Sequence, residues 1–338
     1  MSGRHANISI FVPHIGCTYR CSFCNQYAIT AQTGRPGPSQ VAAAVKAAQK
    51  SPRYNPKTTE LAFFGGSFTA IERDYMQSLL EAAQQPLKSG EICGIRLSTR
   101  PDAVPDSTLS LLKRYGVTAI ELGCQSLQNR VLQLNQRGHT AEDTVLAAKR
   151  VKDFGFELGL QMMTGLYADT DEGALDTAQK IVALSPKTVR IYPTLVLKNT
   201  LLAKLLQSGA YQPQRLEQAV ALTAQLLQLF EQNGIAVIRT GLHAVENGSL
   251  LAGPWHPAFG ELCAARVLRQ KVLRQLQTQK IAPGNVTVTV PVGSLSKMLG
   301  QRKENIEFFR QMGYNVFVLE KQNSAVLVAP GGSLCRRR

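Results

Sequence analysis

Three cysteines near the start of the chain, Cys17, Cys21 and Cys24, form a Cys-x3-Cys-x2-Cys spacing within "HIGCTYRCSFCNQ". Thiolates are soft ligands that bind zinc, copper(I) or iron–sulfur clusters. A structural zinc site needs four ligands, and the nearby His14 precedes the loop without the paired spacing of a zinc finger. A four-iron cluster held by three cysteines keeps one iron open to another ligand. The spacing therefore favours an iron–sulfur cluster with an open iron and leaves zinc as the lesser alternative.

Over the first 240 residues, the sequence alternates between short runs of β-branched or aromatic residues and longer amphipathic stretches. The strands and helices that this pattern predicts must position the cysteine loop. Candidate strands are residues 8–12, 60–64, 94–98, 118–122, 157–162, 187–192 and 235–239. Candidate helices are residues 39–50, 72–84, 106–114, 141–153, 172–184 and 214–232, with Ser39 and Asp106 as expected N-caps. These repeated βα units predict an α/β fold, a partial (βα)6-type TIM barrel with its active-site groups at the carboxyl ends of the strands.

The remainder of the chain breaks this pattern. Residues 241–257 contain Gly, Asn, Pro and the only tryptophan, Trp255, and a basic helix is expected over residues 258–280. A small α+β unit follows, with strands at residues 286–290, 315–319 and 325–329 and a helical stretch at residues 294–312. We therefore predict a barrel domain at residues 1–240, a covering loop and helix at 241–282, and a βααβ module at 283–332.

Composition and charge restrict the kind of protein. With 338 residues, 44% of them hydrophobic, the chain can build one sizeable core and a smaller appendage. No apolar run approaches the roughly 20 residues that span a bilayer, and residues 8–12 are too short for a signal peptide, so we expect a cytoplasmic protein with no membrane association. Seven cysteines, four of them scattered singly, argue against a disulfide framework. A net charge of +15 favours an anionic partner such as nucleic acid, with a basic enzyme lacking such a partner as an equal alternative.

The cysteine loop resembles that of the radical S-adenosylmethionine (SAM) superfamily, because Phe23 supplies the aromatic residue of a Cys-x3-Cys-x-aromatic-Cys pattern after the first strand of a βα barrel. The resemblance implies that the three cysteines hold a [4Fe-4S] cluster whose fourth iron chelates SAM. It also implies an enzyme in which one electron, supplied by flavodoxin or ferredoxin, cleaves SAM to a 5'-deoxyadenosyl radical. That radical would remove a hydrogen atom from a substrate at the barrel mouth.

Other positions carry the same resemblance and imply contacts to SAM. In "FFGGSFT", Gly65, Gly66 and Ser67 follow the second strand, where the family brings main chain close to the SAM amino group. The alternative for the two glycines is an ordinary tight turn. In "ELGCQSLQNRVLQLNQRGHT", Gln125 would hydrogen-bond to the ribose and Arg137 would pair with the carboxylate, whereas as isolated residues both would be solvated surface groups.

Three further residues have a place in this implied pocket. Gly165, in "MMTGLYADT" after the fifth strand, would place main-chain groups along the adenine. Cys124 and Tyr192 stand where they could return a hydrogen atom to a product radical, although packing in the core is the simpler interpretation of both.

Three longer segments are similar to the catalytic subunit of Elongator, which modifies the wobble uridine of tRNA: "STRPD", "QSLQNRVLQLNQRGHT" and "RIYPTLVLKNTLLAKLLQSGAY". The similarity spans roughly residues 8–240 and implies an RNA substrate, with tRNA the first choice. Ser98 stands where that branch has glutamate, so its implied polar contact to SAM differs. Only 98 residues follow Thr240, and they contain no acetyl-CoA loop that we recognise, so we expect no acetyltransferase activity.

Two other functions remain open at this point. Oxygen-independent coproporphyrinogen oxidase shares the cysteine loop and a "GxQS" stretch, so the substrate could instead be a small molecule whose propionates the basic residues neutralise. The third interpretation is a non-catalytic RNA-binding protein with a structural metal.

The "GQRK" segment, residues 300–303, lies between two expected helices of the C-terminal module and resembles the GxxG loop of KH RNA-binding domains. Lys303 stands where the second glycine of that loop belongs. The alternative is an ordinary βααβ module in which Arg302 and Lys303 are solvated charges. Three terminal arginines, residues 336–338, could add contacts to phosphates but no base recognition.

Overall fold

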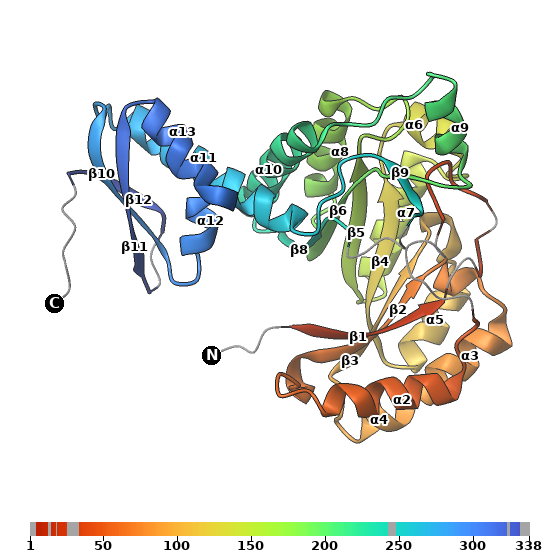
Figure 1. The fold of residues 1–338 in the computed structure, drawn as a ribbon. Helices are drawn as coiled ribbons and strands as arrows, with labels where there is room; N and C mark the ends of the chain where they lie inside the picture. The colour runs from red at the N-terminus through yellow and green to blue at the C-terminus, as the bar shows by residue number, and fades with distance from the viewer. Residues whose placement is uncertain are drawn as a thin grey trace. The chain divides into compact units, whose positions relative to one another are not determined.

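The computed structural model describes residues 5–12, 15–17, 19–25, 34–242, 248–322 and 325–331. The chain divides into two compact units, Met1–Arg215 with Phe230–Trp255, and Leu216–Leu229 with His256–Arg338. Figure 1 traces both by residue number. Within the described ranges, no helix is both long enough and apolar enough to cross a membrane.

The first unit is built on a curved sheet of seven parallel strands in the order β1-β2-β3-β4-β5-β6-β8. The strands are β1 (Ala6–Val12), β2 (Thr59–Gly65), β3 (Gly94–Thr99), β4 (Val117–Gln125), β5 (Glu157–Thr164), β6 (Thr188–Pro193) and β8 (Ala236–Thr240). This arrangement confirms the predicted partial TIM barrel. The (βα)6-type description covers β1 to β6, and β8 extends the sheet by one further strand.

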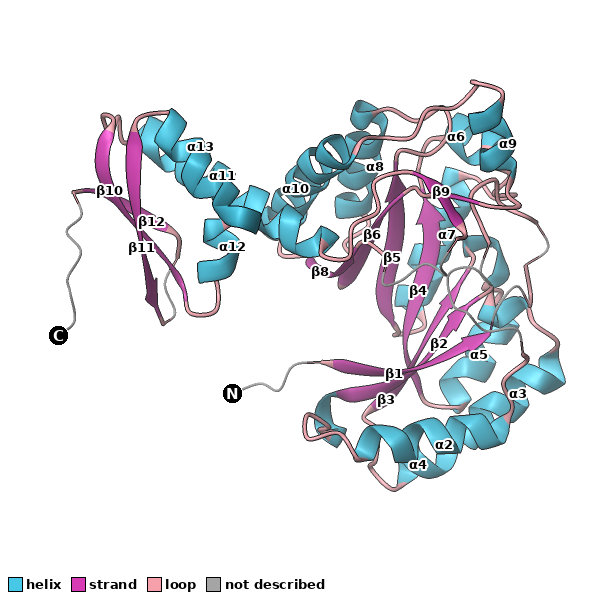
Figure 2. Cartoon of the chain, in the orientation of Figure 1, coloured by secondary structure: helices cyan, strands magenta, loops and turns pink. Residues whose placement is uncertain are grey.

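Helices cover the outer face of this sheet, as Figures 1 and 2 show. The helices that precede α10 are α2 (Pro38–Gln49), α3 (Arg73–Ala82), α4 (Gln84–Lys88), α5 (Asp106–Arg114), α6 (Asn129–Leu134), α7 (Ala141–Asp153), α8 (Asp171–Ala183) and α9 (Leu201–Gln207), of which α6 and α9 lie beyond the ends of the strands. Helix α10 (Leu216–Gln232) follows, and β7 (Val196–Leu197) pairs antiparallel with β9 (Leu250–Ala252).

Two of the helices begin differently from the prediction. Helix α2 has Gly37 as its N-cap, because Pro38 occupies the first helical position, where its fixed φ suits the helix. Helix α5 likewise has Pro105 as its N-cap, and Asp106 is already helical, where its negative charge favours the first turn. The predicted N-cap roles of Ser39 and Asp106 are therefore wrong.

Side chains alternate between the two faces of each strand. On β4, Glu121, Gly123 and Gln125 line a cavity on the inner face, whereas Ile120 and Leu122 are completely buried on the side of the helices. The inner face of the sheet is thus partly polar, and the apolar core lies between sheet and helices.

A network of buried ion pairs crosses the inner face from β2 to β5. The Arg96 guanidinium donates to Glu60 at 2.7 Å, to Glu121 at 3.3 Å and to Glu157 at 3.0 Å. Burial alone would raise the pKa of Glu60, but the hydrogen bond from His5 and the charge and hydrogen bond of Arg96 lower that pKa to about 2. Arg96 therefore joins carboxylates from three strands and helps to lower the pKa of the buried Glu60.

The second unit contains a three-stranded sheet in the order β11-β10-β12. Its central strand β10 (Gly284–Pro291) pairs parallel with β11 (Tyr314–Lys321) and antiparallel with β12 (Leu327–Pro330). The core joins strand β10 to helices α11 (Phe259–Thr278), α12 (Leu295–Leu299) and α13 (Glu304–Gln311) through Val272, Leu276, Val286, Val288, Val290, Met298 and Phe309. All three helices thus pack against one face of the sheet.

Residues 300–303 separate α12 from α13, as the sequence predicts. Arg302 and Lys303 have φ values of 52° and 64°, in the left-handed region that residues other than glycine seldom adopt. The buried Asn305 side chain donates to the main-chain oxygens of Lys297 and Met298 and holds the end of α12 in place. The resemblance of this loop to a KH domain stays a prediction, and the terminal arginines lie outside the described residues.

Candidate active site

A cavity of about 770 Å³ lies on the inner face of the curved sheet. Its volume is within the range of small-molecule and cofactor sites, roughly 300–1,000 Å³. Ten of the eleven residues predicted to bind the cluster or SAM line it: Cys17, Cys21, Phe23, Cys24, Gly65, Gly66, Ser67, Ser98, Gln125 and Arg137. The fold thus gathers residues from the loop after β1, from β2 and the turn that follows it, from β3 and β4, and from the segment after α6 around one space.

The cysteine loop is anchored by the segment that follows α6. The Ser22 amide donates to the main-chain oxygen of Asn135 at 3.0 Å, and the Ser22 hydroxyl donates to Asn135 Oδ1 at 2.6 Å. The completely buried Asn135 in turn donates to the main-chain oxygens of Val131 and Tyr167. Phe23 packs against the apolar cluster that contains Val131. Phe23 therefore fixes the loop by packing and also lines the cavity.

The three cysteines fit a cluster better than a single ion. Among the described residues, no three His, Cys, Asp or Glu side chains converge on one point where an ion could bind. His14, the fourth ligand that zinc would need, lies outside those residues. In a cluster each cysteine binds a different iron, and all three half-buried cysteines line this one cavity.

The glycine turn after β2 is packed tightly against the cysteine loop. Gly66 donates its amide to the main-chain oxygen of Val12 at 2.8 Å. A Cβ atom on Gly66 would lie 2.3 Å from the main-chain oxygen of Ile15, and one on Gly65 would lie 2.8 Å from that of Val12. Gly65 also has a φ of 113°. The chain's own close approach thus requires both glycines.

Replacing Gly66 with alanine is expected to lower the free energy of unfolding by about 1–3 kcal/mol, because the loop must shift to admit the added carbon. The same shift should reduce the iron content of anaerobic preparations. Gly34→Ala is the matched control, since a Cβ there meets nothing within 4 Å. Urea unfolding and iron analysis measure both effects. Equal stability and iron content in the two variants would contradict the prediction.

Arg137 and Gln125 are both buried. Gln125 is the last residue of β4, and Arg137 lies in the segment that follows α6. Arg137 Nη1 donates to Cys21 Sγ at 3.0 Å, Nη2 donates to the main-chain oxygen of Gly123 at 2.6 Å, and the buried Nε has no partner among the residues that the structure describes. Gln125 has a φ of 64° at a bulge between β4 and β5 and accepts a hydrogen bond from Gln161 at 3.0 Å. Arg137 is thus held against the cysteine loop, and its contact with a SAM carboxylate stays a prediction.

Ser67 and Ser98 differ in their surroundings although both line the cavity. The Ser67 hydroxyl is buried, lies 2.9 Å from the hydroxyl of Thr99 and accepts from the Arg100 amide at 3.1 Å. Ser67 therefore ties the glycine turn to the end of β3. No hydrogen bond of the Ser98 side chain is seen among the described residues, so its hydroxyl is available to a ligand.

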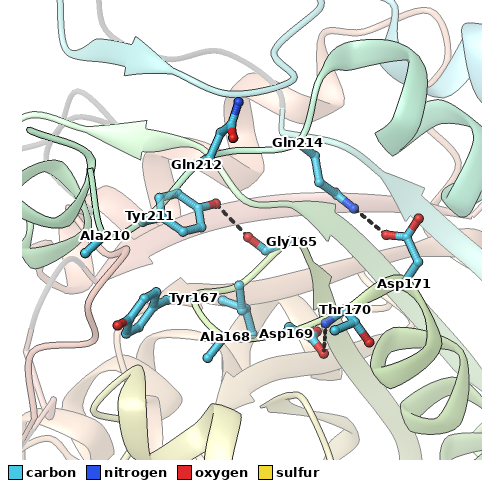
Figure 3. Close-up of a pocket in the computed structure, with 11 residues that line it drawn as sticks. Gly165, Tyr167, Ala168, Asp169, Thr170, Asp171, Ala210, Tyr211, Gln212 and Gln214 are labelled. Carbon is cyan, nitrogen blue, oxygen red and sulfur yellow. Dashed lines mark hydrogen bonds between the residues drawn. The ribbon is translucent and has the colours of Figure 1, made fainter. Parts of the chain in front are cut away.

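Gly165 is the one predicted residue that the structure does not place in this cavity. It lines a second cavity of about 320 Å³ between the loop after β5 and the segment before α10 (Figure 3). The Tyr211 hydroxyl donates to the Gly165 main-chain oxygen at 2.6 Å, and Gln214 donates to Asp171 at 2.9 Å. The Gly165 oxygen is therefore already used by the protein, and its contact with adenine stays a prediction.

The two residues considered for hydrogen return also lie in different surroundings. Tyr192 lines the large cavity. Cys124 is completely buried, its thiol donates to the main-chain oxygen of Gln161 at 2.9 Å, and burial raises its pKa to about 12. The structure thus agrees with packing as the role of Cys124.

The cavity wall also contains residues that sequence reasoning did not single out for the site: Tyr19, Arg20, Arg100, Glu121, Gln161, Met163, Arg190 and Arg239. Polar residues at alternate positions of otherwise apolar strands were the available signal, as with Glu121 between Ile120 and Leu122. Buried parallel strands are ordinarily apolar throughout, so such residues indicate a polar inner face.

Comparison with known proteins decides the family. The profile of the Radical SAM superfamily matches residues 11–181, and that of the Radical_SAM C-terminal domain matches residues 186–269. The chain belongs to the radical SAM superfamily. It is therefore an enzyme of the kind that uses a [4Fe-4S] cluster and SAM, and the cavity fits both, with three thiols on its wall and a buried Arg137 nitrogen left without a partner.

Particular radical SAM proteins resemble this chain over its barrel. The tRNA uridine(34) acetyltransferase of Methanocaldococcus jannaschii is 30% identical over 181 residues, which cover 48% of this chain and 34% of that protein. Human Elongator complex protein 3 is 30% identical over 192 residues, 50% of this chain and 35% of that protein. The chain thus spans about a third of the length of these relatives.

Solved structures show the same fold. The archaeal Elp3 of Methanocaldococcus infernus superposes with a TM-score of 0.63 at 21% identity, covering 84% of this chain and 69% of that one. Streptococcus suis SuiB superposes with a TM-score of 0.51 at 12% identity, covering 71% of this chain and 50% of that one. Both likenesses support the radical SAM half-barrel.

Replacing Arg137 with glutamine is expected to make the reduction potential of the cluster more negative by about 60 mV. A charged N–H donor on a cluster sulfur favours the more negative reduced state. Such a hydrogen bond contributes about 1.5 kcal/mol, which corresponds to about 60 mV for one electron. A spectroscopic redox titration measures the shift, and Arg137→Lys, which keeps the charge, should shift less. An unchanged potential in Arg137→Gln would mean that this contact does not reach the cluster.

Proposed function

We propose that this radical SAM enzyme modifies RNA, with tRNA as the first candidate, and that Cys17, Cys21 and Cys24 hold its cluster. The observation that carries the proposal is the cavity itself, which joins the three cysteines to a strongly basic wall. Five arginines line it against one acidic residue, Glu121. Such a wall suits a polyanionic substrate.

The relatives support tRNA in particular. The archaeal protein that matches the barrel is a tRNA uridine(34) acetyltransferase, and the human one is Elongator complex protein 3. Charge supports the same substrate, because the second unit carries 13 Lys and Arg against 5 Asp and Glu, a net of +8 of the chain's +15. Neutralising phosphates with such residues drives nucleic-acid binding.

The predicted ligand residues that line the cavity have defined parts in this proposal. When bound, the cluster and SAM supply one-electron cleavage and hydrogen-atom abstraction, with flavodoxin or ferredoxin as the proposed electron donor in the cytoplasm. The chain's own residues hold the reactants and exclude water. Arg137 fixes Cys21, the glycine turn supports the loop, and Ser98 and Gln125 offer polar atoms to SAM.

The proposal is tested by incubating the anaerobic, reduced enzyme with SAM and total RNA from cells that lack the gene, followed by mass analysis of nucleosides. We expect a new nucleoside with the wild type and with Cys93→Ala, whose exposed thiol lies outside the cavity, and none with Cys21→Ala. SAM cleavage without any altered nucleoside, together with no tRNA binding below the micromolar range at low salt, would reject RNA and favour a small-molecule substrate.

A further inference from the structure

The arginines that line the cavity differ in what neutralises them. Arg100 forms an ion pair with Asp102 at 2.5 Å. Arg190, on β6, donates to Glu121 at 2.9 Å. Burial lowers the pKa of Arg190, but the charge of Glu121 raises it above its ordinary value. These two guanidinium groups are satisfied by the protein and have no need of an external anion.

Arg239, on β8, has no such neutralising partner. Among the described residues no carboxylate pairs with it, and its one hydrogen bond runs from Nε to the main-chain oxygen of Gly241 at 2.9 Å. Burial lowers the pKa of Arg239, and the charge of Arg190 lowers it further against the opposing effect of Tyr192. A half-buried cation beside a second cation is stabilised by any anion that binds there.

The backbone brings Arg239 to this place through an irregularity. Pairing between β6 and β8 shifts by one residue, so that Val189 pairs with Val237 and Arg190 with Arg239. Ile238 and Arg239 consequently both line the cavity, although neighbouring residues of a regular strand face opposite sides. Bulges are commonly placed where they redirect a side chain into a site.

We propose that Arg239 binds a phosphate group of the RNA substrate, with the Tyr192 hydroxyl as a second donor. This inference rests on the proposed function and adds the subsite that holds the substrate. A guanidinium presents paired N–H groups that match phosphate oxygens. Both Nη groups of Arg239 lack acceptors within the described protein, and the Tyr192 hydroxyl accepts from Arg190 at 3.5 Å, so its own proton is available to a ligand.

The location of Arg239 suits a substrate subsite rather than a SAM contact. Strand β8 is at one end of the sheet, and β1, which precedes the cysteine loop, is at the other. A phosphate on Arg239 therefore lies across the cavity from the thiols, with the nucleoside between them. At about 770 Å³ the cavity admits SAM and a single nucleotide but no duplex. The target nucleotide thus enters unpaired, as in other enzymes that act on single bases.

The test compares Arg239→Gln with Arg53→Gln, a charge-matched control at an exposed residue outside the cavity. Each anaerobic, SAM-loaded full-length chain is titrated with inorganic phosphate at constant ionic strength, and separately with tRNA over a series of salt concentrations. We expect Arg239→Gln to weaken both affinities by about tenfold and to reduce the salt slope of tRNA binding by about 1, with Arg53→Gln unchanged in phosphate affinity. Arg239→Lys should be intermediate, because it keeps the charge and loses the paired donors. Iron content and the urea midpoint show that each variant is folded.

The outcomes separate this inference from the proposed function. If wild type and Arg239→Gln bind phosphate equally, the subsite does not exist, whether or not RNA is the substrate. If phosphate affinity falls in Arg239→Gln while tRNA affinity is unchanged, an anion site exists that does not serve RNA, and the inference is again overturned. If wild type binds phosphate through Arg239 but binds no tRNA, the proposed function fails and the anion belongs to a small-molecule substrate.

Discussion

Replacing Cys21 with alanine is expected to leave a folded chain that holds little iron–sulfur cluster and no longer cleaves SAM. Each of the three cysteines would bind one iron, and the loop contains no further cysteine that could replace a lost ligand. We expect the yield of 5'-deoxyadenosine after reduction to fall by at least about 10³-fold, equivalent to about 4 kcal/mol of barrier. Iron and sulfide per chain, measured on oxygen-free preparations, should fall with it.

The control for this prediction is Cys93→Ala. Cys93 is exposed, donates to the main-chain oxygen of Thr59 at 3.3 Å and lies outside the cavity. The turn hydrogen bond of the cysteine loop runs between main-chain atoms of Cys24 and Cys21, so alanine at residue 21 retains it. Full iron content and SAM cleavage in Cys21→Ala, or zinc in place of iron in the wild type, would refute the cluster assignment.

Replacing Arg96 with methionine is expected to lower the free energy of unfolding by about 3–5 kcal/mol at pH 7, because it leaves the buried Glu60 carboxylate without its guanidinium partner and Glu121 with Arg190 alone. The Arg96 side chain is only 4% exposed, and Glu60 and Glu121 beside it are 9% and 4% exposed. Arg310→Met is the control: Arg310 pairs with Glu307 at 2.7 Å, but its side chain is 74% exposed, so its removal should cost no more than about 1 kcal/mol. Urea unfolding of the three proteins measures the difference.

The cost of Arg96→Met should also depend on pH. In the folded protein the pKa of Glu60 is held at about 2, below its ordinary value of 4.5. A lowered carboxylate pKa contributes stability that is full above pH 4.5 and is lost as pH falls through the folded value near 2. The gap between wild type and Arg96→Met should therefore narrow over that window as Glu60 becomes neutral. A gap that is constant from pH 7 to about pH 3 would show that Glu60 does not carry the effect.

Local sequence was sufficient to predict most of the fold and to single out the three cysteines as candidate cluster ligands. Cys17, Cys21 and Cys24 lie within eight residues of one loop. Their prediction as a group therefore does not depend on the correct prediction of distant helices and strands. The βα repeats were equally predictable, because amphipathic period and strand length are local properties. The prediction of N-caps failed at Ser39, because Pro38 is already the first helical residue, and at Asp106, because Pro105 is the N-cap.

Contacts between distant segments were decided only in three dimensions. Arg137 reaches Cys21 across 116 residues, and Ser22 reaches Asn135 across 113. Gly165 follows a predicted strand as expected, yet its oxygen is taken by Tyr211, in a separate cavity. Which partner a polar group finds depends on the packing of whole elements, and no local pattern encodes it.

The sequence by itself determined the metal chemistry, the family and the half-barrel, because each depends on short-range spacing and periodicity. The tertiary structure alone decided how the polar side chains of the cavity pair with one another, and it added Arg190 and Arg239 to the predicted ones. Bulges between β4 and β5 and between β6 and β8 move the register by one residue, and in a strand one residue is the difference between facing the helices and facing the cavity. Gln125 faces the cavity by the regular alternation of β4, whereas Arg239 lines it beside its neighbour Ile238 because of the irregularity between β6 and β8, which the strand pattern does not reveal.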